Sequence, residues 1–118
     1  MTYTPRQEVW IAISDLFLDT DVTRFQDNIL QVCRASGFDL ATLDDIFIRD
    51  VYPACIANLY DIGGEWITFD PSALIRRIER RQGRLLFGRF TLWLRWRRAR
   101  DMVPEWFKIR TLLSALET

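Results

Sequence analysis

The sequence predicts an all-α fold, a compact single-domain bundle of six or seven short helices that spans residues 1–118. Hydrophobic residues recur every three or four positions in successive segments, which is the spacing of one helix face. Pro5, Pro71 and Pro104 stand where such segments begin, and proline is well tolerated in a first helical turn. Hydrophobic residues make up 49% of the chain, which is enough for one buried core.

The first helix is predicted to begin at Pro5. Thr4 can cap it, and Gln7 stands where the second partner of a capping box is found. The pattern ends near Asp19–Thr20. The predicted inward face consists of Val9, Trp10, Ile13, Leu16 and Phe17.

The second helix is predicted to be capped by Asp21. Gly37 is a good left-handed stop for this helix, and Phe38 can make the hydrophobic contact that follows such a stop. The predicted inward face consists of Phe25, Ile29, Val32 and Cys33.

A third helix is expected to begin within Asp39–Thr42, with an inward face that consists of Leu43, Ile46, Phe47 and Val51. Pro53 lacks a backbone N–H and clashes with the preceding helical turn, so we expect the helix to break there. A short helix over Ala54–Tyr60 and a turn at Gly63–Gly64 should follow.

The fourth pattern is a basic amphipathic helix that begins with Asp70 as cap and Pro71 in the first turn and ends at Gly83. Its inward residues are expected to be Leu74, Ile75 and Ile78. Its outward residues are expected to be Arg76, Arg77, Arg80 and Arg81.

Residues 85–101 fit a helix, but the alternation from Phe90 to Trp96 also fits a strand, so both alternatives stay open. Trp93 lies near Leu86 and Phe90 on a helical projection, and we expect it to pack inward. Pro104 opens the last helix. The face of that helix consists of Trp106, Ile109, Leu112, Leu113 and Leu116.

The formal net charge of zero hides a division between the two parts of the chain. Residues 1–70 carry twelve acids and four arginines, a net charge of −8. Residues 71–118 carry twelve bases and four acids, a net charge of +8. Because both parts fold into one small domain, some arginines should pair with acids of the first part. The arginines expected to supply these pairs are Arg95, Arg97, Arg98 and Arg100.

The charges left over are the candidate partner-binding surfaces, since strong charge of one sign steers association. The candidate acidic face consists of Asp39, Asp44, Asp45, Asp50 and Asp61. The alternative basic face consists of Arg77, Arg81, Arg95, Arg97 and Arg98. Of the two faces, we favour the acidic one for docking, with the pair Asp44–Asp45 meeting a basic cleft of the partner.

The composition argues against catalysis, and we expect no catalytic residue, metal or cofactor. The chain has no histidine, the commonest general base and metal ligand. Cys33 and Cys55 are typical of buried thiols, and a disulfide between them is not needed. No basic leader and no apolar run long enough for a bilayer appears, so we expect a cytoplasmic protein without membrane contact.

Three stretches resemble a family of small uncharacterised bacterial proteins. They are "EVWIAISDLFLDT" (8–20), "VYPACIANLYDIGGEW" (51–66) with Phe69 following, and "VPEWFKIRTLL" (103–113). The resemblance implies a shared all-helical fold and transfers no catalytic residue. Such proteins are similar to immunity proteins of contact-dependent and type VI secretion toxins. Trp66 and Phe69, within the Gly-Glu-Trp-x-x-Phe pattern, should be buried.

The expected function is therefore a non-enzymatic binding protein, an immunity protein that neutralises a cognate toxin by direct contact. A nucleic-acid-associated or regulatory module that uses the basic second part is the alternative. The acidic first part and the sequence pI of about 6.2 make nucleic acid a poor partner. Self-association, with acidic and basic parts meeting head to tail, is the third interpretation.

Overall fold

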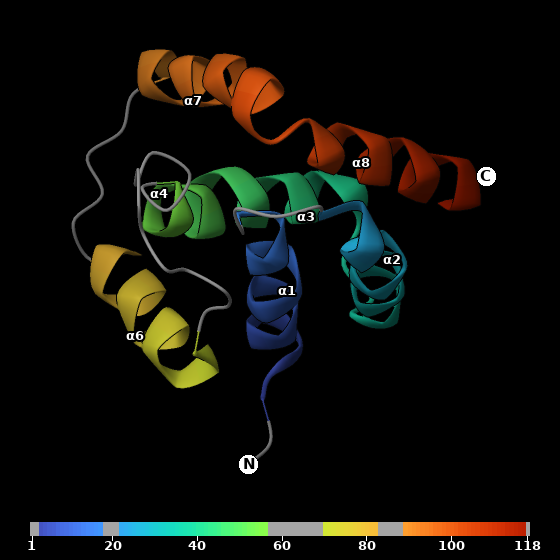
Figure 1. Cartoon of the computed structure of the whole chain (residues 1–118), viewed down its shortest axis with the longest axis horizontal. Helices are drawn as coiled ribbons and strands as arrows, with labels where there is room; N and C mark the ends of the chain where they lie inside the picture. Colours follow the sequence, from blue (N-terminus) through green and yellow to red (C-terminus); the bar gives the residue numbers. More distant parts are fainter. Residues whose placement is uncertain (1–2, 18–21, 57–69, 83–88, 118) are drawn as a thin grey trace.

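The computed structural model describes residues 3–17, 22–56, 70–82 and 89–117, and these ranges contain helices and no strand (Figure 1). The prediction of an all-α fold is confirmed. The Cα radius of gyration is 13.7 Å, close to the roughly 13.5 Å expected for a compact domain of this length. None of the described helices is long and apolar enough to cross a membrane.

Helix α1 (Pro5–Ser14) begins with the predicted capping box. The Gln7 backbone N–H donates to Thr4 Oγ1 at 3.1 Å, and the Thr4 N–H donates to Gln7 Oε1 at 3.0 Å. A single 3₁₀ turn, Asp15–Phe17, extends the helix. Its inward residues match the predicted face, because the capping box sets where the helical register begins.

Helix α2 (Gln26–Ala35) follows a 3₁₀ turn over Val22–Phe25. The α-helix thus begins later than predicted, and the expected cap Asp21 lies outside the described residues. Gly37 has a φ of +79°, which confirms the predicted left-handed stop.

The centre of the molecule is one rod made of α3 (Leu40–Asp45), a π-helix (Ile46–Val51) and α4 (Tyr52–Cys55). The predicted break at Pro53 is wrong. The π-helix shifts hydrogen bonding from i−4 to i−5, so that the Tyr52 N–H donates to Phe47 O. This wider turn lets the rod continue into Pro53, which stands in the first turn of α4, where its missing N–H matters least.

Several expectations for the following segment fall on residues that the structure does not describe. Helix α4 ends at Cys55, and most of the predicted helix Ala54–Tyr60 lies outside the described ranges. The Gly63–Gly64 turn, Trp66 and Phe69 lie outside them as well.

The other helices pack around the central rod, which lies between α1 and α2 on one side and α7 and α8 on the other (Figure 1). Phe47 lies at the centre of a cluster of aromatic side chains in the core. Its ring stacks on Trp106 with 4.9 Å between centroids and also contacts Phe17, Tyr52 and Trp96. This cluster links the rod to α7 and α8.

Helix α6 (Pro71–Gln82) begins at the predicted cap, where the Ala73 N–H donates to Asp70 Oδ2 at 3.0 Å. Helices α7 (Arg89–Met102) and α8 (Pro104–Glu117) follow, separated by Val103. Residues 89–102 are therefore helix, and the strand alternative is wrong for them. Residues 85–88 lie outside the described ranges.

The predicted inward packing of Trp93 is also wrong, because its side chain is 52% exposed. The face of α7 that turns toward the core runs through Leu92, Trp96 and Ala99, at spacings of four and three residues. Trp93 stands one position after Leu92, about 100° around the helix, and so projects beside that face.

Among the described residues, helix α8 supplies an ion pair between the acidic first part of the chain and the basic second part. Arg110 pairs with Asp44 at 2.7 Å. Within the described ranges, Arg97, Arg98 and Arg100 form no ion pair, so the expected pairing of these three with acids is not found there. Arg95 instead donates from Nη1 to the Ile48 carbonyl at 3.3 Å.

Candidate functional site

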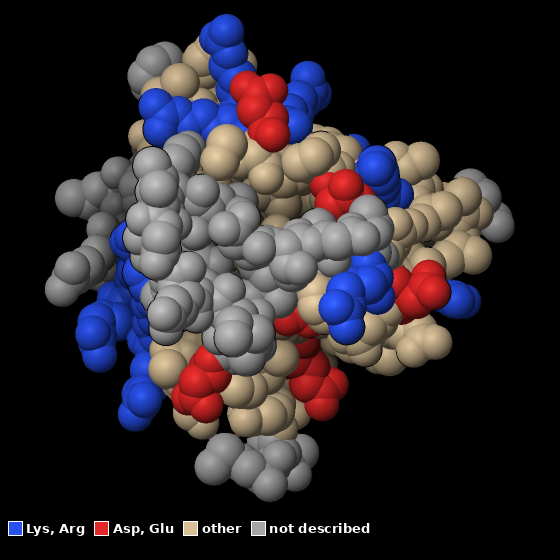
Figure 2. Space-filling model, viewed as in Figure 1, with Lys and Arg blue, Asp and Glu red and all other residues tan. Residues whose placement is uncertain are grey.

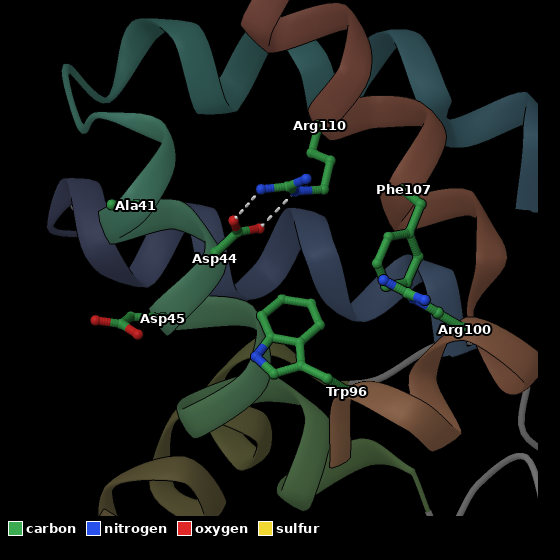
Figure 3. A pocket seen from close by; sticks show the side chains of 7 residues that line it. All are labelled: Ala41, Asp44, Asp45, Trp96, Arg100, Phe107 and Arg110. Atoms are coloured by element: carbon green, nitrogen blue, oxygen red, sulfur yellow. Dashed lines mark hydrogen bonds and ion pairs between the residues drawn. The ribbon is translucent and has the colours of Figure 1, made fainter. Parts of the chain in front are cut away.

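Asp44 joins α3 to α8 through three hydrogen bonds to one carboxylate. Trp106 Nε1 donates to Oδ1 at 3.0 Å. Arg110 donates from Nε to Oδ1 at 3.1 Å and from Nη2 to Oδ2 at 2.7 Å (Figure 3). The hydrogen bond from Arg110 raises the pKa of its guanidinium. Asp44 is 17% exposed. Its first role is therefore structural, to hold α8 against the rod.

Asp50 is held in the same way by α1. Arg6 donates from Nε and Nη2 at 3.2 and 2.9 Å, and Trp10 Nε1 donates at 3.0 Å. The Asp50 side chain is 4% exposed. In both clamps a tryptophan and an arginine four residues apart on one helix donate to an aspartate of the rod.

The remaining acids of the candidate acidic face have different roles and positions. Asp39 caps α3, and its hydrogen bonds with Thr42 lower its pKa. Asp45 is exposed and lies 3.5 Å from Arg49. Asp61 lies outside the described residues. Because Asp44 and Asp50 are also enclosed, the structure does not bring this set together as one exposed face.

The candidate basic face is divided between two helices. Arg77 and Arg81 are exposed on α6, and Arg97 and Arg98 are exposed on α7. Arg95 is partly buried, which lowers the pKa of its guanidinium, and the charge of nearby Arg81 lowers it further. Figure 2 shows basic side chains gathered over α7 and along the outer side of α6.

A hollow of about 420 Å³ opens between α3, α7 and α8 (Figure 3). Its α7 wall is formed by Trp96 and Arg100, and Arg100 lies over the ring of Phe107 at 5.8 Å. The Trp96 ring packs against Phe47, with 5.7 Å between the ring centroids. The residues that line the hollow are Ala41, Asp44, Asp45, Trp96, Arg100, Phe107 and Arg110.

A second hollow of about 310 Å³ adjoins the first and shares Trp96 and Arg100 with it. Trp93 and Arg97 also line this second hollow, and the Arg97 guanidinium lies 5.5 Å from the centre of the Trp93 ring. We name the four residues Trp93, Trp96, Arg97 and Arg100 the Trp-Arg stripe, and the two hollows together the stripe groove. The four residues fall within an arc of about 100° on α7.

Sequence reasoning placed Arg97 on a candidate basic face but missed the groove. It placed Trp93 inward, and it did not bring Phe107 and Arg110 of the last helix to the opposite wall. The spacing of Trp93 and Arg97, repeated by Trp96 and Arg100, is the signal that marks one helix side.

No group of three histidine, cysteine or acidic side chains that could hold a metal is found among the described residues. Cys33 and Cys55 are buried free thiols, and burial raises the pKa of each to about 12. Both therefore stay protonated at neutral pH and supply no thiolate nucleophile.

Comparison with known proteins places the chain in one family. Searches of curated proteins and of solved structures each found no match. A family model described as "Domain of unknown function (DUF7079)" matches residues 4–112, which include α1 and most of α8. The chain belongs to this family, domain of unknown function DUF7079.

Proposed function

We propose that this chain is a non-enzymatic binding protein, and within that class an immunity protein that neutralises a cognate bacterial toxin by direct contact. The observation that carries the proposal is the Trp-Arg stripe. Trp10 and Trp106 are buried, whereas Trp93 is 52% exposed and lies at the edge of a groove. Tryptophan and arginine are enriched among the residues that dominate protein–protein binding energy.

The chemistry of the groove supports binding over catalysis. Asp44 accepts three hydrogen bonds and is committed to α8, so it is poorly placed to act as a general base. Asp45 is exposed and forms an ion pair with Arg49 at 3.5 Å, so it is not enclosed beside a reacting group. A wall of preorganised aromatic and guanidinium groups can bind a protein surface with little loss of side-chain entropy.

The class of immunity proteins fits a domain of this kind. Such a protein works by covering a toxin, so it requires a stable scaffold and one complementary face. Charge of one sign on that face speeds and orients the encounter. Arg97, Arg98 and Arg100 give α7 such a charge, since none of them forms an ion pair within the described ranges.

A nucleic-acid-associated module is the second candidate, favoured by α6. This helix exposes Arg76, Arg77, Arg80 and Arg81. If it tracked phosphates, affinity for a short duplex would fall steeply as salt rises. Replacing Arg77 and Arg81 with alanine would then abolish that affinity.

Co-expression tests the proposal. Products of the genes that neighbour the gene for this chain are expressed in a bacterial host, each with and without the chain, and growth is measured. We expect one product to stop growth, the chain to restore it, and the two proteins to co-elute as a complex. If the chain restores growth against none of the toxic products, the immunity proposal is wrong.

A further inference from the structure

We propose that the stripe groove accepts an acidic segment of the partner protein. In this arrangement carboxylates of the segment pair with Arg97 and Arg100, and an apolar side chain between them lies against Trp93 and Trp96. The inference rests on the proposed binding function and names the chemistry of its partner. It reverses the expectation that Asp44 and Asp45 meet a basic cleft.

Charge complementarity is the first argument. Asp44 and Arg110 on the far wall pair with each other at 2.7 Å, and exposed Asp45 lies 3.5 Å from Arg49. Arg97 and Arg100 have no carboxylate partner in the described part of the chain. The groove therefore keeps a surplus of positive charge along its α7 wall, which an anionic segment would balance.

Preorganisation is the second argument. Arg97 lies over Trp93 and Arg100 lies over Phe107, so both guanidinium groups are held by aromatic rings. A held guanidinium loses less side-chain entropy when it forms paired hydrogen bonds with a carboxylate. The arginines stand three residues apart on one helix side, so neighbouring carboxylates of a single segment can reach both.

The shape of the apolar surface favours a peptide over nucleic acid. Single-stranded nucleic acid needs open aromatic faces on which bases stack. Arg97 already lies over the Trp93 ring, and Trp96 packs against Phe47 and Phe107.

Peptide binding measured by calorimetry tests the inference. One short peptide carries leucines between pairs of glutamates, a second carries lysines in place of the glutamates, and the third probe is a single-stranded DNA of similar length. We expect the purified chain to bind the acidic peptide and neither of the other probes. The Arg97→Gln/Arg100→Gln variant should bind it at least about tenfold more weakly, since charge-assisted hydrogen bonds are the strong ones.

The matched control is Arg76→Gln/Arg80→Gln, which removes the same charge from the exposed side of α6. It should bind the acidic peptide within about twofold of the parent, since only long-range charge changes. Circular dichroism establishes that both variants are folded. Equal binding of the acidic peptide by both variants overturns the inference. A preference of the chain for the lysine peptide or for the DNA also overturns it, as does a chain that binds no peptide because it forms a dimer.

The two proposals can fail separately. If the chain protects against a toxin and Arg97→Gln/Arg100→Gln protects equally, the acidic-segment inference is wrong and the immunity proposal stands. If no neighbouring product is neutralised but the acidic peptide binds through these arginines, the immunity proposal is wrong and the inference stands.

Discussion

Replacing Trp106 with alanine is expected to lower the free energy of unfolding by about 3–5 kcal/mol, the range for large-to-small changes of a buried aromatic residue. The Trp106 side chain is 0% exposed, and its ring lies nearly parallel to that of Phe47, with 10° between the planes. Its indole N–H also donates to Asp44. The substitution therefore opens a cavity at the junction of α8 with the rod and removes one of the three hydrogen bonds that hold Asp44.

Chemical denaturation followed by circular dichroism measures this effect. Trp93→Ala is the matched control, because it makes the same change at a tryptophan that is 52% exposed. It should alter the free energy of unfolding by about 0.5 kcal/mol or less, as exposed positions usually do. If the two variants lose similar stability, Trp93 is a core residue and the Trp-Arg stripe is not an exposed surface.

Replacing Asp50 with alanine is expected to lower the free energy of unfolding by about 3 kcal/mol, because it leaves a buried donor and a cation without their acceptor. Trp10 Nε1 would lose the acceptor that lies at 3.0 Å, and Arg6 would lose its ion pair at 2.9 Å. Thermal or urea unfolding measures the loss.

The control for this prediction is Asp45→Ala on the same rod. Asp45 is 65% exposed, and its ion pair with Arg49 is worth about 0–1 kcal/mol, so this variant should unfold close to the parent. An Asp50→Ala protein that is as stable as Asp45→Ala would show that the α1 clamp contributes nothing to folding.

Features fixed by neighbouring residues could be predicted from the sequence. The Thr4 and Gln7 capping box, the Asp70 cap and the left-handed Gly37 each depend on interactions within a few positions of the chain. Hydrophobic spacing then assigned most inward residues correctly, since the helical register follows from where a helix begins. It was wrong on α8 for Leu112 and Leu116, which are 39% and 50% exposed.

Features fixed by contacts between distant segments could not be predicted. The bonds that hold Asp44 join positions 62 and 66 residues apart, and those of Asp50 span 40 and 44 residues. Nothing local distinguishes these aspartates from Asp45, which stays exposed. The choice of partner follows from which helices pack together, and that is a property of the whole bundle.

The errors at Pro53 and Trp93 have the same origin. Local preferences predict that a helix ends before proline. In the structure the π-helix Ile46–Val51 allows the rod to continue past Pro53. A helical projection places Trp93 near Leu86 and Phe90. The side of α7 that faces inward is instead the side on which Trp96 contacts Phe47. Tertiary packing overrides the local preference in both cases.

The measurement that tests the central claim most directly is backbone hydrogen exchange of the chain, free and bound to the toxin that it neutralises. The account predicts slower exchange in the complex over residues 93–100 of α7 and the first turns of α8, which together line the stripe groove. Slower exchange confined to α6 or to α1 and α2, with α7 unchanged, would contradict it.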